Sequence, residues 1–201
     1  MGDVGVRRAT PRDRVAASGV LASAFSRESL LVWIMDHPRA AHRRLRHLFE
    51  AILDIELRKP VHCVEMTTDG DAVALWRPPG DWQAPPLHLI RCLPAAVRTF
   101  GAALGGALRT LSKVEKLHPR EPHYHLAYLG ARQGRQGRGL GSALMRSMLD
   151  RCDAEGVPAY LENSKHRNVG FYTRQGFVRR GEIPLPQGAP PLTAMWREPR
   201  G

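Results

Sequence analysis

The residues best placed to do chemistry form one glycine-rich run, Gln136-Gly137-Arg138-Gly139-Leu140-Gly141-Ser142. An apolar, strand-like run over residues 126–129 precedes it, and a helix-like run begins at Leu140. Glycines at alternate positions leave backbone N–H groups bare at the start of a helix, where proteins bind phosphate groups. A side chain there would hold a phosphate away from the amides. The spacing indicates an anion site; from the run alone, a glycine-rich turn without a ligand is an equal alternative.

Regular elements on both sides must position this run. Helices are predicted at residues 10–25, 38–58, 85–118, 140–152 and 167–175. Strands are predicted at residues 4–8, 61–66, 72–76, 126–129, 157–163, 176–182 and 192–197. Pro94, Gly101, Gly105 and Gly106 are expected to weaken the segment 85–118 and to produce a break in it. The mixed order of helices and strands predicts an α+β (mixed α/β) fold in a single domain, residues 1–201.

The order strand, glycine loop, helix and strand, followed by Asn168-x-x-Phe171-Tyr172-x-x-x-Gly176-Phe177, resembles the GNAT superfamily of N-acetyltransferases. Residues 121–178 carry this resemblance, and Gln136, Gly139 and Gly141 match the family's Q/R-x-x-G-x-G/A loop. Chain length, element order and the run Asp71-Ala72-Val73-Ala74-Leu75-Trp76 make the sequence most similar to the puromycin N-acetyltransferase branch. The resemblance implies the GNAT acyl-CoA fold, with a central mixed sheet flanked by helices and two splayed strands. Its cofactor-binding core would span about residues 121–183.

The resemblance also implies acetyl-CoA as the acyl donor and no metal. The whole run 136–142 would bind the cofactor, and Asn168 would hydrogen-bond its pantetheine arm. A backbone N–H near Tyr128 or Leu129 would polarise the thioester carbonyl. Tyr172 is the candidate general acid, because a phenol, with a pKa of about 10, stays protonated at neutral pH and can donate to a departing sulfur. A half-buried structural tyrosine is the alternative.

The general base and the acceptor site are less well defined by the sequence. Glu162, on a predicted strand after the phosphate helix, is the base that the resemblance favours, and His123 and His125 titrate near neutrality. Glu65 and Asp36 are weaker candidates. Trp33, Asp36 and His125 are expected to face the amine, and His37 is a further candidate. The apolar run 30–35 that contains Trp33 could equally be a buried helical turn.

Composition restricts the class of protein and its partners. The net charge is +11 and the isoelectric point about 10.5, which suits a polyanion such as coenzyme A. The sequence contains no recognisable helix-turn-helix or zinc-ligand spacing that would predict specific nucleic-acid binding. It also contains no apolar run long enough to predict a membrane span. The start of the chain lacks an apolar signal-peptide core, and three scattered cysteines suit the reducing cytoplasm. Both a monomer and a homodimer are compatible with these observations.

The sequence thus predicts an acetyl-CoA-dependent N-acetyltransferase that acts on the primary amine of a small molecule by direct attack on the thioester. The segment 85–118 favours an enclosed acceptor site over an open groove for a protein. Acetylation of a protein lysine or N-terminus stays open as an alternative. A protein that senses acyl-CoA, or binds nucleic acid, without catalysis is the other.

Overall fold

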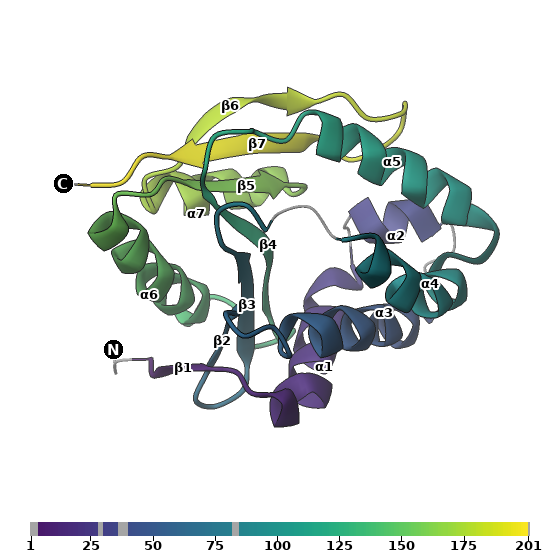
Figure 1. The fold of residues 1–201 in the computed structure, drawn as a ribbon, viewed down its shortest axis with the longest axis horizontal. Helices are drawn as coiled ribbons and strands as arrows, with labels where there is room; N and C mark the ends of the chain where they lie inside the picture. Colours follow the sequence, from purple (N-terminus) through teal and green to yellow (C-terminus); the bar gives the residue numbers. More distant parts are fainter. Residues whose placement is uncertain (1–3, 28–29, 36–39, 82–84, 201) are drawn as a thin grey trace.

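A seven-stranded mixed sheet organises the computed structural model, which describes residues 4–27, 30–35, 40–81 and 85–200 (Figure 1). Its strands are β1 (Val6–Arg8), β2 (Cys63–Thr67), β3 (Ala72–Arg77), β4 (Tyr124–Ala131), β5 (Ala159–Asn163), β6 (Val178–Ile183) and β7 (Leu192–Arg197). They lie in the order β1-β2-β3-β4-β5-β7-β6. Among the described strands only β4 and β5 pair in parallel. The predicted α+β fold, with a central mixed sheet flanked by helices, is confirmed.

Helices cover both faces of the sheet because the inner strand β3 is apolar on both faces. Val73 and Leu75 of β3 pack with α1 (Arg14–Phe25) and α3 (Ala41–Glu56). Ala74 and Trp76 of the same strand face the opposite layer, which contains α6 (Leu140–Glu155). Leucine and phenylalanine at helical spacing give α3 its buried face, as the sequence predicts. Two apolar cores therefore fix β3 and β4, the strands beside the glycine run.

The segment 85–118 forms two helices rather than one. α4 (Pro86–Phe100) is followed by the short η2 (Gly101–Ala103) and by α5 (Leu104–Lys116). The predicted break lies at Gly101, whose φ of +54° is a conformation that suits glycine. Pro94 lies inside α4 without ending it. Most of the leucines and valines that lie at helical spacing in this segment are exposed, so they do not form the buried face of a core helix.

Other boundaries differ little from the sequence-based ones. Residues 30–35 form the short helix α2 (Leu30–Met35), in which only Met35 is buried. The short helices η1 (Pro11–Asp13) and η3 (His166–Asn168) precede α1 and α7 (Val169–Arg174), respectively. The helix predicted from residue 38 is described from Ala41 onward. Within the described ranges, every helix is too short or too polar to cross a lipid bilayer.

Candidate active site

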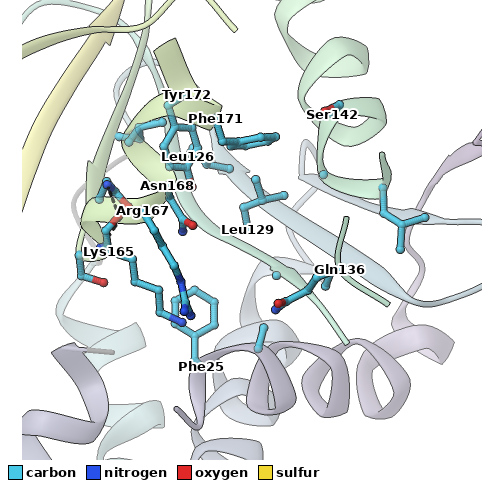
Figure 2. A pocket seen from close by; sticks show the side chains of 18 of the residues that line it. Phe25, Leu126, Leu129, Gln136, Ser142, Lys165, Arg167, Asn168, Phe171 and Tyr172 are labelled. Carbon is cyan, nitrogen blue, oxygen red and sulfur yellow. Dashed lines mark hydrogen bonds between the residues drawn. The ribbon is translucent and has the colours of Figure 1, made fainter. Parts of the chain in front are cut away.

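A cavity opens where β4 and β5 separate. Their parallel pairing ends at Leu126↔Leu161, although β4 continues to Ala131. The pairing of β4 with β3 skips Ala127, which forms a β-bulge. The separated strands line a cavity of about 560 Å³, shown in Figure 2. The bulge lies on the strand where the sequence analysis places the backbone N–H that polarises a carbonyl.

The glycine run closes one end of this cavity. Gly139 immediately precedes α6, and its φ of +80° is a conformation that L side chains rarely adopt. No described side chain caps the first turn of α6, so its backbone N–H groups are available to an anion. The predicted residues that line the cavity here are Gln136, Gly137, Gly139, Leu140, Gly141 and Ser142. Arg138 is exposed and outside this lining, and its contact with a cofactor stays a prediction.

Positive charge surrounds the cavity. Its basic lining residues are Arg135, Lys165, Arg167 and Arg174. Glu162 is the one acid among the described lining residues. Asp71 holds Arg135 in place, with Oδ2 3.0 Å from the arginine Nε. The side chains of Lys165 and Arg167 extend toward Phe25 of α1 (Figure 2). Such a lining attracts a phosphate-rich ligand.

Tyr172 and Asn168 line the cavity from the segment after β5, opposite Leu129 of β4 (Figure 2). The Tyr172 ring packs on Phe171 and Phe177, with ring centroids 5.1 Å and 6.1 Å away. Burial raises the pKa of Tyr172 above its usual value, so its hydroxyl is protonated at neutral pH. This side chain can donate a proton but cannot act as a resting base.

Glu162 joins the cavity to a buried group of histidines. Its Oε2 accepts a hydrogen bond of 2.8 Å from His125 Nε2, and its Oε1 lies 3.2 Å from His118 Nδ1. Burial by itself raises the pKa of Glu162, but the imidazoles of His125 and His118 more than offset this and hold it well below its usual range. The side chain is therefore a carboxylate at neutral pH. Sequence analysis missed His118, which lies in the linker after α5.

The predicted acceptor residues do not come together in one place. Trp33 lines a second cavity, of about 520 Å³, between α2, η2 and α5. His125 contacts Glu162 instead, behind the first cavity. Asp36 lies outside the described residues, as does His37. Glu65, a weaker candidate base, accepts a hydrogen bond from Ser147 of α6 at 3.0 Å and does not line either cavity.

We predict that His123 makes stability depend on pH. Burial lowers its pKa to about 4, against about 6.5 in an unfolded chain. The unfolded chain therefore binds more protons between these values, and this contribution to stability is present above pH 6.5 and lost as the pH falls toward 4. Urea unfolding midpoints should fall less steeply across this range in His123→Gln than in the wild type. Equal slopes would contradict the assignment.

Comparisons with known proteins agree with this geometry. The family model described as "Acetyltransferase (GNAT) family" matches residues 71–177. An uncharacterized N-acetyltransferase of Schizosaccharomyces pombe is 26% identical over 213 residues, which cover 96% of this chain and 83% of that protein.

Solved structures extend the comparison to the whole chain. A Corynebacterium glutamicum protein, described as histone acetyltransferase HPA2 and related acetyltransferase, superposes with a TM-score of 0.74 and 28% identity, covering 100% of this chain and 98% of its own. Agmatine N-acetyltransferase shares the fold, with a TM-score of 0.66, 18% identity, and coverage of 98% and 100%. The family match spans the glycine run, the β4–β5 opening and Tyr172, and the chain therefore belongs to the GNAT family of N-acetyltransferases.

Proposed function

We propose that the protein transfers the acetyl group of acetyl-CoA to the primary amine of a small molecule, by direct attack of the amine on the thioester. One observation carries the proposal. A single cavity is lined by the start of α6, which no described side chain caps, by the buried side chain of Tyr172 and by the carboxylate of Glu162. These are an anion site, a proton donor and a proton acceptor, which acyl transfer to an amine requires.

The cofactor-binding residues fit the predicted ligand. The amides after Gly139 and the charge of Arg135 suit a pyrophosphate. Asn168 and Leu129 both line the cavity and lie on opposite sides of it, where a pantetheine arm could pass between them (Figure 2). Acetyl-CoA, when bound, supplies an activated acetyl group on a thioester. A backbone N–H beside the bulge at Ala127 would donate to the carbonyl oxygen as negative charge develops there.

The proposed reaction includes two proton transfers, one from the amine and one to the departing sulfur. As the nitrogen–carbon bond forms and the carbon–sulfur bond breaks, the amine loses a proton to Glu162, directly or through water. Tyr172 gives its hydroxyl proton to the departing sulfur and regains one from solvent. One potential metal-ligand atom from each of His118, His125 and Glu162 lies within 4.8 Å of the others, and the contacts of the two histidines with Glu162 account for that proximity. We therefore propose a metal-free reaction, which a chelator should leave unchanged.

The acceptor is proposed to be a small amine because helices cover the side of the sheet from which it would approach. α2, η2 and α5 enclose the second cavity together with Pro186 of the β6–β7 loop. The similar agmatine N-acetyltransferase is named for a small amine, and membership of the puromycin N-acetyltransferase branch would imply another. We further propose a cytoplasmic monomer or homodimer without specific nucleic-acid partners.

A panel of amines tests the proposal. Each acceptor would be mixed with acetyl-CoA and the protein, and the release of free thiol would be measured. The acceptors are puromycin, agmatine, further primary amines and a lysine-containing peptide. We expect at least one small amine to be acetylated faster than the peptide. A preference for the peptide would instead favour protein acetylation. The similar Corynebacterium glutamicum protein is described as a histone acetyltransferase, which is consistent with that alternative.

We predict that Gly139→Glu abolishes cofactor binding. Acetyl-CoA binds the folded state and should raise the melting temperature of the wild type. A glutamate at Gly139 adds negative charge and strain beside the α6 amides, so this rise should disappear. Gly156→Glu is the matched control, because Gly156 also has a positive φ, at +65°, and open space around it, but lies at the other end of α6. Loss of the rise in both variants would contradict the assigned site.

A further inference from the structure

A chain of hydrogen-bonded groups leads from Glu162 to the backbone. His118 Nδ1 lies 3.2 Å from Glu162 Oε1, and His118 Nε2 lies 3.0 Å from His123 Nε2. At the far end, His123 Nδ1 lies 2.6 Å from the carbonyl oxygen of Glu121. Both histidines are buried. His118 follows the last turn of α5, and His123 directly precedes β4.

The carbonyl at the end of the chain determines where the hydrogens lie. A carbonyl oxygen can only accept, so His123 Nδ1 carries the hydrogen. Burial lowers the pKa of His123 to about 4, so the ring is neutral at neutral pH and its Nε2 is an acceptor. His118 Nε2 must therefore be the donor in the contact between the two rings. The Glu121 carbonyl thus fixes the tautomer of His123 and, through it, that of His118.

While His118 is neutral, this tautomer presents a lone pair at Nδ1 to a carboxylate oxygen. Once His118 is protonated, the same nitrogen donates to Glu162, and that is the state in which His118 lowers the pKa of Glu162. Two acceptors at 3.2 Å repel each other unless one proton lies between them. The other carboxylate oxygen accepts from His125 Nε2, whose Nδ1 has no hydrogen-bond partner in the described part of the chain. His125 therefore stabilises the negative charge of Glu162, but it places no proton between Glu162 and His118.

We propose that Glu162 and His118 take up the acceptor's proton as a pair, and that His123 is the positioning residue that gives the pair its proton affinity. This rests on the proposed function, in which Glu162 receives the amine proton. On its own, a carboxylate with a lowered pKa is a weak base. In the pair, a proton that reaches Glu162 moves onto His118 Nδ1 and removes the repulsion. The proton is then released to solvent after the product leaves.

Other charged and titratable groups lie near Glu162 and His118, but none of those among the described residues takes over the positioning role of His123. His125 of β4 and Tyr160 of β5 pack on the His118 ring, with centroids 4.7 Å and 4.9 Å away. Burial and the neighbouring Glu162 raise the pKa of Tyr160, so it stays a neutral phenol. Arg180 of β6 lies further out, over the Trp196 ring.

Two substitutions of His123 separate the tautomer from simple packing. His123→Phe keeps a ring against Tyr160 and Trp196 but removes the acceptor, so a neutral His118 can move its hydrogen to Nδ1 and satisfy Glu162 without a further proton. His123→Gln keeps an acceptor near the position of Nε2. We expect His123→Phe to lower kcat/KM by about tenfold or more, as part of the factor of about 10² to 10⁴ that a positioned base supplies. The acid limb of its pH profile should move to lower pH. His123→Gln should restore both.

Nitrogen NMR of the imidazoles provides a readout that needs no acceptor. At alkaline pH, His118 should show the Nε2–H tautomer in the wild type and in His123→Gln, and the Nδ1–H tautomer in His123→Phe. The Nδ1–H tautomer in the wild type overturns the inference, whether or not the phenylalanine variant folds. So do equal pH profiles in an active wild type and His123→Phe. An inactive wild type with the expected tautomers would instead reject only the proposed function.

Discussion

Replacing Tyr172 with phenylalanine is expected to lower the rate of thiol release by about 10²-fold or more, the usual contribution of a positioned general acid. The substitution removes one hydroxyl and leaves the ring packed against Phe171 and Phe177. Affinity for acetyl-CoA, measured as the rise in melting temperature, should hardly change. The loss should therefore appear in kcat, because the missing proton donor acts on the departing sulfur and not on the bound ground state.

Tyr124→Phe is the matched control for this experiment. Its hydroxyl donates a hydrogen bond of 2.6 Å to Glu155 Oε2, and its side chain does not line the cavity. Removing the Tyr124 hydroxyl removes one hydrogen bond but leaves the proposed proton donor, Tyr172, in place. Turnover should therefore persist while the free energy of unfolding falls modestly. If Tyr172→Phe and the wild type turned over equally, the proton would have to come from water or from another group.

Local spacing explains what could be predicted from the sequence. The glycine run and the start of α6 depend on neighbouring residues, so Gly139 and the lining of the anion site were accessible to sequence analysis. Tyr172 and Asn168, which line the cavity, belong to a motif that covers one short helix and the residues on either side of it. The periodicity of residues 85–118 correctly predicted a helical segment, and its proline and glycines predicted a break without fixing its position, which is Gly101. It could not show that many of the apolar side chains stay exposed, because periodicity identifies a face and not what covers it.

Contacts between distant residues account for the parts that were missed. His118 meets Glu162 across 44 positions and His123 across five, and no local pattern relates a linker histidine to a carboxylate on β5. The opening between β4 and β5 depends on a strand register and on the bulge at Ala127. Trp33, which we expect beside the amine, lines the second cavity. The position of α2 follows from its packing against α4 and η2, so the sequence could not show where Trp33 lies relative to the first cavity.

Glu162→Gln is expected to lower kcat/KM by about 10² to 10⁴-fold near neutral pH, because an amide cannot accept the amine proton. Its shape is close to that of glutamate, so the melting-temperature rise with acetyl-CoA should remain. Activity should recover as the pH rises, since an alkyl ammonium with a pKa of about 10 loses its proton to solvent increasingly often. Tyr172→Phe should not show this recovery, because its defect lies on the departing sulfur. The two pH profiles therefore distinguish a missing base from a missing acid.

Glu65→Gln supplies the control for a lost buried carboxylate. Burial raises the pKa of Glu65, and Ser147 is its hydrogen-bond donor, but the residue lies away from the cavity. Turnover by this variant should stay near the wild-type rate. Comparable losses in Glu162→Gln and Glu65→Gln would point to a general disturbance of the fold. A Glu162→Gln enzyme that is fully active at neutral pH would move the base elsewhere, and His125, which contacts Glu162 directly, would be the next residue to replace.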